Sequence, residues 1–186
     1  MIDRLKVIAA VCGLMIAVYI ADLLSGGYLK SFGIHPREIG SIYTIFTSPW
    51  LHGDIFHLAN NLFGLAIFGA LCLMKGVRYF FSASVLIILL TGILVWLFAR
   101  DANHIGASGW IFGLWSLTIA LAWFERSFQS IAIGIAVIFF YSGMAFGVLP
   151  TNSAISFEGH LFGALSGILV AALLEKNEKF ARWAGS

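Results

Sequence analysis

Apolar residues are grouped along this chain into long runs, separated by shorter segments rich in glycine, proline and charge. A helix needs about 20 mostly apolar residues to cross a bilayer core of about 30 Å. The runs therefore predict six transmembrane helices, over about residues 5–24, 55–74, 79–99, 108–124, 128–149 and 159–174. An even number of passes leaves both ends of the chain on the same side. The pattern predicts an all-α polytopic membrane protein in which residues 1–186 form one transmembrane domain.

The segment between the first two runs, from Ser25 to about Gly53, is unusually long for a connection within a bundle. It contains several glycines and prolines, and residues 41–47 form an aromatic and apolar stretch that is too short to cross a bilayer. We expect this first loop to be embedded in the membrane or to lie at its interface, rather than to act as a linker.

Composition excludes the other broad classes. Hydrophobic residues make up 60% of the chain and charged residues only 11%, so a water-soluble fold could not cover its apolar side chains. A net charge of +2 without a basic run does not indicate nucleic-acid binding. Cys12 and Cys72 both lie in apolar runs and are interpreted as packed thiols. We expect an integral membrane protein surrounded by a lipid bilayer, with no nucleic-acid partner.

The basic residues orient the predicted helices, because cytoplasmic loops carry an excess of lysine and arginine. A cytoplasmic N-terminus places eight of the eleven basic residues on that side: Arg4, Lys6, Lys75, Arg78, Arg126, Lys176, Lys179 and Arg182. Both termini are then cytoplasmic, and the first, third and fifth loops face the periplasm or the cell exterior. The second, fourth and sixth helices begin at that outer face.

This orientation brings four polar residues to one level near the outer face. His57 and Asn61 lie in the first turns of the second helix, and Ser108 and His160 begin the fourth and the sixth. The seventeen residue steps from Ser108 to Glu125 correspond to about 25 Å of helix, against a core of about 30 Å. Polar groups at such depth normally face the bundle interior or a water-filled cavity.

Two of the helices carry glycines at four-residue spacing: Gly109 and Gly113 on the fourth, and Gly159, Gly163 and Gly167 on the sixth. Such ridges let two helix backbones approach closely. If these faces meet, His160 lies beside Ser108 and can accept the hydroxyl proton. N–H groups of Ser108, His57 and Asn61 could then stabilise an oxyanion.

Simpler interpretations exist for each of these residues. Ser108 could only cap its helix, the glycine ridges could only pack, and Asn61 could only make an interhelical hydrogen bond. A zinc site from His52, His57 and His160 is conceivable, but no accompanying ligand motif supports it. We therefore expect neither a metal nor a cofactor.

An acidic residue could complete a triad with Ser108 and His160. The candidates lie in loops or at helix ends: Asp54, Asp101 and Glu158. Nothing in the sequence requires one of them, so a Ser–His dyad is favoured. Phe112, one helical turn after Ser108, could stack on the imidazole of His160 and hold the ring in place of an acid.

Three short motifs stand in order on the second, fourth and sixth predicted helices. They are His57-Leu58-Ala59-Asn60-Asn61 with Gly69 eight residues later, Gly106-Ala107-Ser108-Gly109 with Phe112 and Gly113, and Gly159-His160 with Gly163 and Gly167. Each is weak alone, but the ordered set is highly specific and resembles the rhomboid family of intramembrane serine proteases. The resemblance covers most of the chain, from about Gly33 to Gly167.

The resemblance implies a rhomboid-like helical bundle and a serine endopeptidase that cleaves transmembrane segments of other membrane proteins. Ser108 would be the nucleophile, and His160 the general base and later the general acid. His57, Asn61 and the Ser108 backbone N–H would form the oxyanion hole. The supporting positions would be Phe112, Gly106, Gly109, Gly113, Gly159 and Gly163.

The family further implies that the fifth helix and the fifth loop act as a substrate gate. Without a soluble N-terminal domain or a seventh helix, the sequence is similar to a minimal six-helix bacterial type. This predicts a place in the bacterial inner membrane, with the active site open to the periplasmic or extracellular side.

One departure from the family and two alternative functions remain open. The Trp-Arg pair common in the family's first loop is replaced by Tyr43-Thr44, which leaves the structural contacts of that loop in question. A non-proteolytic rhomboid relative that binds membrane clients would be expected to have lost Ser108 or His160, and both are present. A small transporter would need polar groups along its whole path, whereas the candidates cluster near the outer face.

Overall fold

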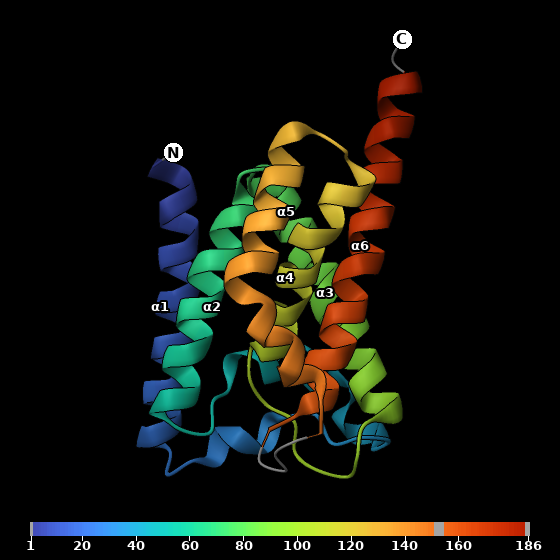
Figure 1. Ribbon diagram of the computed structural model, residues 1–186. Helices are drawn as coiled ribbons and strands as arrows, with labels where there is room; N and C mark the ends of the chain where they lie inside the picture. Colours follow the sequence, from blue (N-terminus) through green and yellow to red (C-terminus); the bar gives the residue numbers. More distant parts are fainter. Residues whose placement is uncertain (1, 151–154, 185–186) are drawn as a thin grey trace.

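The computed structural model describes residues 2–150 and 155–184, which form a bundle of long helices (Figure 1). The α-helices are α1 (Ile2–Leu24), α2 (Ile55–Leu73), α3 (Val77–Phe98), α4 (Ser108–Phe124), α5 (Phe128–Tyr141) and α6 (Phe157–Ala184). The first turn of α1 and the last turns of α6 lie at the same end of the bundle (Figure 1). The all-α polytopic architecture is therefore confirmed.

Two helices differ from the predicted extents. α5 ends as an α-helix at Tyr141 and is followed by the 3-10 helix η4 (Ser142–Val148), where one helix to about residue 149 was expected. η4 contains Gly143 and Gly147, and glycine is a poor α-helix former. α6 continues to Ala184 instead of ending near residue 174, because lysine and glutamate after the apolar run are good helix formers.

Some predictions fall where the structure gives no description. Residues 151–154, at the start of the expected fifth loop, lie outside the described residues. The side chains of Lys179 and Arg182, which the orientation used, lie outside them as well.

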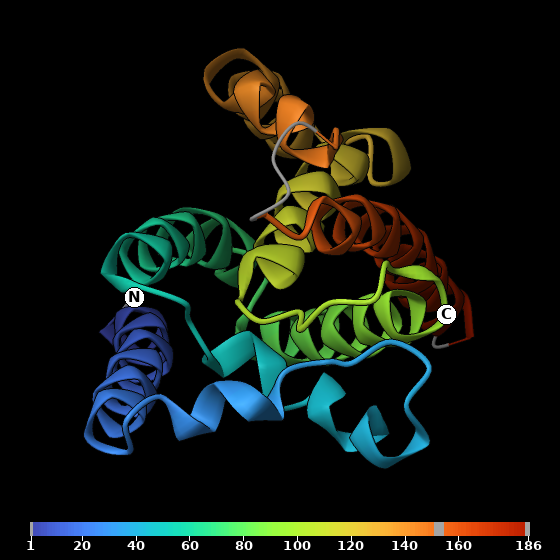
Figure 2. The same cartoon turned by 90° about the horizontal axis from the view of Figure 1, so that it is seen from below.

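Five helical segments within the described ranges are long and apolar enough to cross a membrane: Asp3–Leu24, Ile55–Leu73, Val77–Phe98, Phe128–Val148 and Phe157–Lys176. α4 is apolar but shorter, with 17 residues, which is about 25 Å of helix. It lies at the centre of the bundle, with α2, α3, α5 and α6 packed around it (Figure 2). Protein, rather than lipid, therefore covers most of α4.

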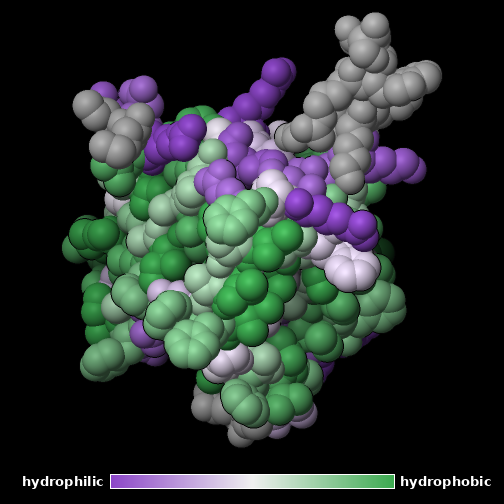
Figure 3. All heavy atoms as spheres, turned by 45° about the horizontal axis from the view of Figure 1, so that its top comes forward, coloured by the Kyte–Doolittle hydropathy of each residue, from purple (hydrophilic) through white to green (hydrophobic). Residues whose placement is uncertain are grey.

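The sides of the bundle are apolar. Large hydrophobic side chains are exposed on α1, α2, α3 and α5, among them Leu14, Phe63, Val85, Ile135 and Phe139. Hydrophilic side chains gather at the end where α1 begins (Figure 3). Soluble proteins rarely expose so much contiguous apolar surface, whereas lipid tails would cover it. The surface and the helix lengths together indicate an integral membrane protein.

The glycine ridges of α4 and α6 meet. A Cβ atom at Gly163 would collide with the carbonyl oxygen of Gly109, and one at Gly167 with that of Gly113. The Ser116 hydroxyl of α4 also donates a hydrogen bond to the Ala164 carbonyl of α6 over 2.7 Å. The two backbones are therefore in direct contact, and larger residues at these positions would separate them.

Three 3-10 helices, η1 (Tyr28–Phe32), η2 (Ile39–Ile45) and η3 (Ser48–Trp50), form most of the first loop. The side chain of Ile45 packs against Gly92 of α3, while Ile39 and Ile42 are exposed. A segment with one face packed and one apolar face exposed suits a membrane interface.

The Tyr43-Thr44 pair is accommodated within the loop. Thr44 is buried, and its hydroxyl donates a hydrogen bond to the Ser41 carbonyl, whereas the Tyr43 side chain is exposed. The loop is tied to the end of α3 by Arg37, whose guanidinium donates to the Ala99 carbonyl over 2.7 Å. Other residues therefore anchor this loop.

Candidate active site

A cavity of about 760 Å³ lies between α2, α4, η4 and the start of α6. The end nearest the loops is polar and is lined by the four residues singled out in the sequence: Ser108, His160, His57 and Asn61. The end nearest the middle of the bundle is apolar, where the rings of Phe68 and Tyr141 stand 5.2 Å apart, edge to face. The fold thus brings residues from three separate helices onto one cavity.

Ser108 is the first residue of α4 and lines this cavity. Ala107 occupies the N-cap position, and no side chain caps the helix there. The Ser108 hydroxyl makes no hydrogen bond within the described residues, so it is not used as a cap. The positive end of the helix dipole points toward it, which favours a negative charge at this oxygen.

Gly106 shapes the turn before Ser108. Its φ of 115° lies in a region that favours glycine, and a Cβ atom there would be 2.5 Å from Nε2 of His57. Its backbone N–H donates to the Ser48 carbonyl over 2.9 Å. Both the backbone conformation and the close approach of His57 therefore require glycine.

His160 is buried in the first turn of α6 and is held on two sides. Its imidazole stacks on the Phe112 ring, with centroids 4.1 Å apart and planes inclined by 6°. Its Nδ1 lies 2.9 Å from the Gly147 carbonyl of η4. A carbonyl can only accept, so Nδ1 carries the proton, and in the neutral ring Nε2 is left as a base. The Phe112 stack was expected from the sequence, but the Gly147 contact was not.

Gly147 is required by space as well. A Cβ atom there would lie 2.7 Å from Cζ of Phe112 and 3.4 Å from Nδ1 of His160. The sequence offered only a glycine near the end of the fifth apolar run, because the partner of its carbonyl is set by tertiary packing.

No hydrogen bond joins the Ser108 hydroxyl to His160 within the described residues, although both line the same cavity. Hydrogen bonds of catalytic pairs are often long without substrate and shorten when substrate binds.

His57 and Asn61, on α2, supply N–H donors to the same cavity. Nδ1 of His57 accepts from the Gly53 N–H over 3.3 Å, so in the neutral ring the proton is on Nε2, the atom nearest Gly106. Asn61 is buried, and its Nδ2 has no hydrogen-bond partner within the described residues. A buried donor without a partner is costly, and an oxyanion in the cavity would satisfy it.

The three acidic candidates are engaged elsewhere or exposed. The Asp54 carboxylate caps α2 by accepting from the His57 backbone N–H over 2.9 Å, and this bond lowers the pKa of Asp54. Glu158 lies 3.6 Å from the Arg100 guanidinium, and Asp101 is exposed. None of their hydrogen bonds within the described residues reaches His160.

The histidines considered for zinc do not converge. The rings of His52 and His57 are 5.1 Å apart, whereas His160 is bonded to Gly147. Burial, followed by the charge of His57, lowers the pKa of His52 to about 4. Across residues 2–150 and 155–184, no group of three or more His, Cys, Asp or Glu side chains is placed to hold a metal ion. Cys12 and Cys72 are free thiols.

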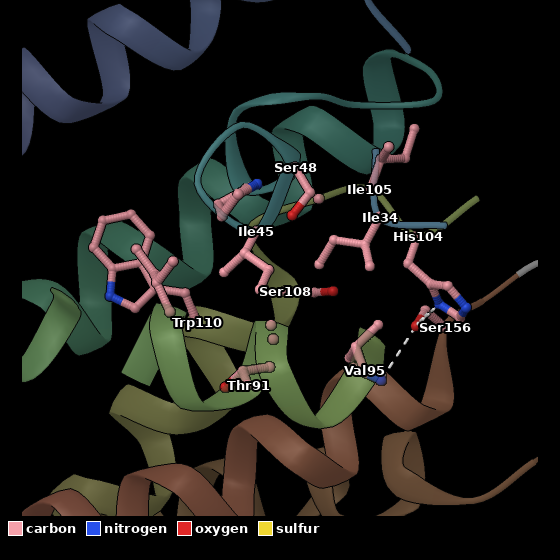
Figure 4. A pocket seen from close by; sticks show the side chains of 16 residues that line it. Ile34, Ile45, Ser48, Thr91, Val95, His104, Ile105, Ser108, Trp110 and Ser156 are labelled. Carbon is pink, nitrogen blue, oxygen red and sulfur yellow. Dashed lines mark hydrogen bonds between the residues drawn. The ribbon is translucent and has the colours of Figure 1, made fainter. Parts of the chain in front are cut away.

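A second hollow of about 40 Å³ lies on the other side of Ser108, between the first loop and α3 (Figure 4). Ser48 and Thr91 line it, and the side chains of His104 and Ser156 lie next to each other at its edge (Figure 4). Neither His104 nor Ser156 was among the candidate residues selected from the sequence.

These features define a polytopic α-helical membrane protein with a serine, two histidines and an asparagine on one cavity near the loop end of its bundle. A family model described as the rhomboid domain matches residues 40–177, and the chain belongs to the rhomboid family.

Similar proteins occur in bacteria and plants. An uncharacterized protein of Mycobacterium tuberculosis is 34% identical over 178 residues, which cover 91% of this chain and 74% of that protein. A protein of Mycobacterium leprae is 31% identical over 91% of this chain and 70% of its own length. Rhomboid-like protein 11, chloroplastic, of Arabidopsis thaliana is 30% identical over 87% of this chain and 62% of its own length.

Proposed function

We propose that this protein is an intramembrane serine endopeptidase that uses a dyad of Ser108 and His160. The observation that carries the proposal is the environment of His160. Its ring is stacked on Phe112 and its Nδ1–H is directed to the Gly147 carbonyl, which leaves Nε2 as a base on the cavity that Ser108 lines. A merely structural histidine would not require its second nitrogen to remain available.

In the proposed reaction, the Ser108 hydroxyl oxygen attacks the substrate carbonyl carbon while Nε2 of His160 takes the hydroxyl proton. The tetrahedral oxyanion is bound by the Ser108 backbone N–H, His57 Nε2–H and Asn61 Nδ2–H. His160 then returns the proton to the leaving amine, and the peptide bond breaks to give an acyl-enzyme. Water, activated by His160, hydrolyses the ester and releases Ser108.

The cavity suits a substrate that enters from the bilayer. Its apolar end can cover hydrophobic side chains, and its polar end can bind an exposed peptide bond. A helical peptide bond is already hydrogen-bonded, so the substrate helix must unwind locally before cleavage. We therefore propose transmembrane segments of other membrane proteins as substrates, favouring those with helix-breaking and small residues near the cut.

The same proposal includes location and orientation. The excess of basic residues at the end where the chain begins favours cytoplasmic termini in a bacterial cell membrane. The polar end of the cavity would then open toward the periplasm or the cell exterior. Entry past α5 and η4 is the proposed gate, because η4 both borders the cavity and contacts His160.

The test is labelling by a fluorophosphonate probe and cleavage of a single-span substrate in detergent. We expect Ser108→Ala and His160→Ala to abolish cleavage, and Ser108→Ala also to abolish labelling. Both variants should remain folded; the thermal midpoint of Ser108→Ala should equal that of the wild type, and that of His160→Ala should be slightly lower, because it loses the Phe112 stack and the Gly147 hydrogen bond.

Ser116→Ala is the matched control, since Ser116 lies two turns further along α4 and bonds to Ala164 of α6. It should be labelled like the wild type. Full cleavage by both dyad variants would contradict the proposal, and an intact fold with no Ser108-dependent labelling would favour a client-binding rhomboid relative.

A further inference from the structure

His104, in the loop before α4, is a buried histidine that connects three segments. Its backbone exchanges two hydrogen bonds of 2.9 Å with Ile34 of the first loop. Its Nε2 lies 3.0 Å from the Arg100 carbonyl at the end of α3. Its Nδ1 lies 2.7 Å from the Ser156 hydroxyl, just before α6. The proposed reaction gives none of these contacts a role.

The positions of the two partners along the chain match. His104 lies four residues before Ser108, and Ser156 lies four residues before His160. Their hydrogen bond therefore joins the two segments that lead into the proposed dyad. Next to the dyad, the backbones of α4 and α6 touch at Gly109, the residue after Ser108, and Gly163, three residues after His160. The proposed dyad thus lies between two contacts that join α4 and α6 or the segments before them: the His104–Ser156 hydrogen bond and the Gly109–Gly163 backbone contact.

The direction of each hydrogen bond follows from its partners. The Arg100 carbonyl can only accept, so Nε2 of His104 carries the proton and Nδ1 of the neutral ring accepts from the Ser156 hydroxyl. The same hydroxyl oxygen accepts from the Gly159 N–H over 3.1 Å and so satisfies a free donor at the start of α6. His104 therefore fixes the residue that caps the helix carrying His160.

An ion pair lies next to the hydrogen bond between His104 and Ser156. The Arg100 guanidinium lies 3.6 Å from the Glu158 carboxylate and donates to the Ile155 carbonyl over 2.7 Å. Burial lowers the pKa of His104; the Arg100 carbonyl and Glu158 oppose this, and the charges of Arg100 and His35 add to it. The ring is therefore neutral at neutral pH, as the bond from Ser156 requires.

We propose that His104 and Ser156 are positioning residues that fix the first turn of α6 and thereby hold the His160 imidazole in place beside Ser108. The effect of this positioning on catalysis rests on the proposed protease function, whereas its effect on the orientation of the His160 ring does not.

Two substitutions of His104 separate its two nitrogens. The amide oxygen of His104→Asn can take the place of Nδ1 and accept from Ser156. The amide of His104→Gln reaches the position of Nε2 and the Arg100 carbonyl, but leaves Ser156 without its acceptor. His35→Ala removes another histidine from the same end of the protein and serves as the control.

The first readout is the His160 ring resonance in detergent-solubilised protein labelled with ¹⁵N-histidine, since stacking on Phe112 at 4.1 Å gives it a distinctive ring-current shift. The second is the rate at which a fluorophosphonate labels Ser108. We expect His104→Gln to move the resonance and to slow labelling by roughly tenfold to a hundredfold. His104→Asn and His35→Ala should leave both readouts near wild type.

A wild-type resonance and labelling rate in His104→Gln would overturn the proposal. Equal losses in the Asn and Gln variants would overturn it too, because the bond to Ser156 would then not matter. If His104→Gln does not fold, Ser156→Ala against Ser156→Thr, which keeps the hydroxyl, makes the same comparison. If wild-type Ser108 is not labelled, the protease proposal fails, and the resonance alone decides whether His104 positions His160.

Discussion

The two sides of α4 are built in opposite ways. Toward α6, Gly163 and Gly167 bring the two backbones into direct contact. Toward α2 and η4, α4 faces a cavity of about 760 Å³. We call these the tight side and the open side of α4. Ser108 and His160 lie on α4 and α6, the two helices of the tight side, and both line the cavity of the open side. The α4–α6 pair thus gives the site its rigidity, and the space between α4, α2 and η4 gives a substrate access to it. Substitutions on the tight side should change the thermal midpoint, and substitutions on the open side should change the cleavage rate.

The largest effect is expected on the tight side. Gly163→Leu would drive a side chain into the Gly109 carbonyl and should lower the free energy of unfolding by about 3 kcal/mol or more. The thermal midpoint in detergent measures this. Gly13→Ala in α1 is the control, since a Cβ atom there meets nothing within 4 Å, and it should leave the midpoint unchanged or raise it. Equal midpoints for the two variants would remove the distinction between the sides.

On the open side, the rate should change without a loss of stability. Asn61→Leu removes a proposed oxyanion donor and should lower kcat by roughly 100-fold or more. Since the Asn61 amide nitrogen is buried without a partner, the thermal midpoint should stay equal or rise. Steady-state cleavage with a parallel melting curve tests both statements. A rate near that of the wild type would exclude Asn61 from the oxyanion hole.

Phe112 lies at the border between the two sides. Phe112→Leu keeps an apolar residue but removes the ring that stacks on His160, a contact worth about 1 kcal/mol. Labelling of Ser108 should slow by about tenfold or less, with a small change in the midpoint. The bond from His160 to Gly147 should keep part of the orientation, so complete inactivity would show that the Gly147 carbonyl contributes little.

The smallest expected effect is on the pH dependence of stability. Burial lowers the pKa of His52 from 6.5 to about 4, so the unfolded chain binds a proton between these values and the folded chain does not. Stability is therefore complete above about pH 6.5 and falls as the pH drops toward 4. Between pH 7 and 6 the loss should be less than about 1 kcal/mol. Melting curves of the wild type and His52→Gln test this, and identical pH slopes would contradict it.

The sequence predicted the parts of the fold that depend on local pattern. Apolar runs predicted the helices. The four-residue glycine spacing indicated faces of α4 and α6 that allow close approach, and in the structure these faces meet. The predicted spans 128–149 and 159–174 agree with the apolar segments Phe128–Val148 and Phe157–Lys176. The α-helices themselves end elsewhere, at Tyr141 and Ala184, because hydropathy reports which residues prefer lipid and not where the helical hydrogen bonds stop. Lys176 follows the apolar run, yet the helix continues.

The candidate site divides in the same way. Ser108, His160, His57 and Asn61 could be selected by type and position, and the structure brings them to one cavity. The hydrogen-bond acceptor for His160 could not be predicted from the sequence, because it is the backbone carbonyl of Gly147 and every residue has a carbonyl. Ser156 carried one usable signal, a serine three residues before Gly159 that is typical of a helix N-cap.

The choice of a peptide carbonyl as the partner of His160 has a consequence for acid tolerance. A carboxylate at the position of the Gly147 carbonyl would itself become protonated in acid, and its hydrogen bond to the His160 ring would then weaken. The amide oxygen of Gly147 has no ionisation in the range where proteins remain folded. A hydrolase built on this pair should lose activity on the acid side through protonation of imidazole rings, and not through loss of the acceptor that holds His160. As the pH falls, the activity should be lost before the orientation of the His160 ring changes.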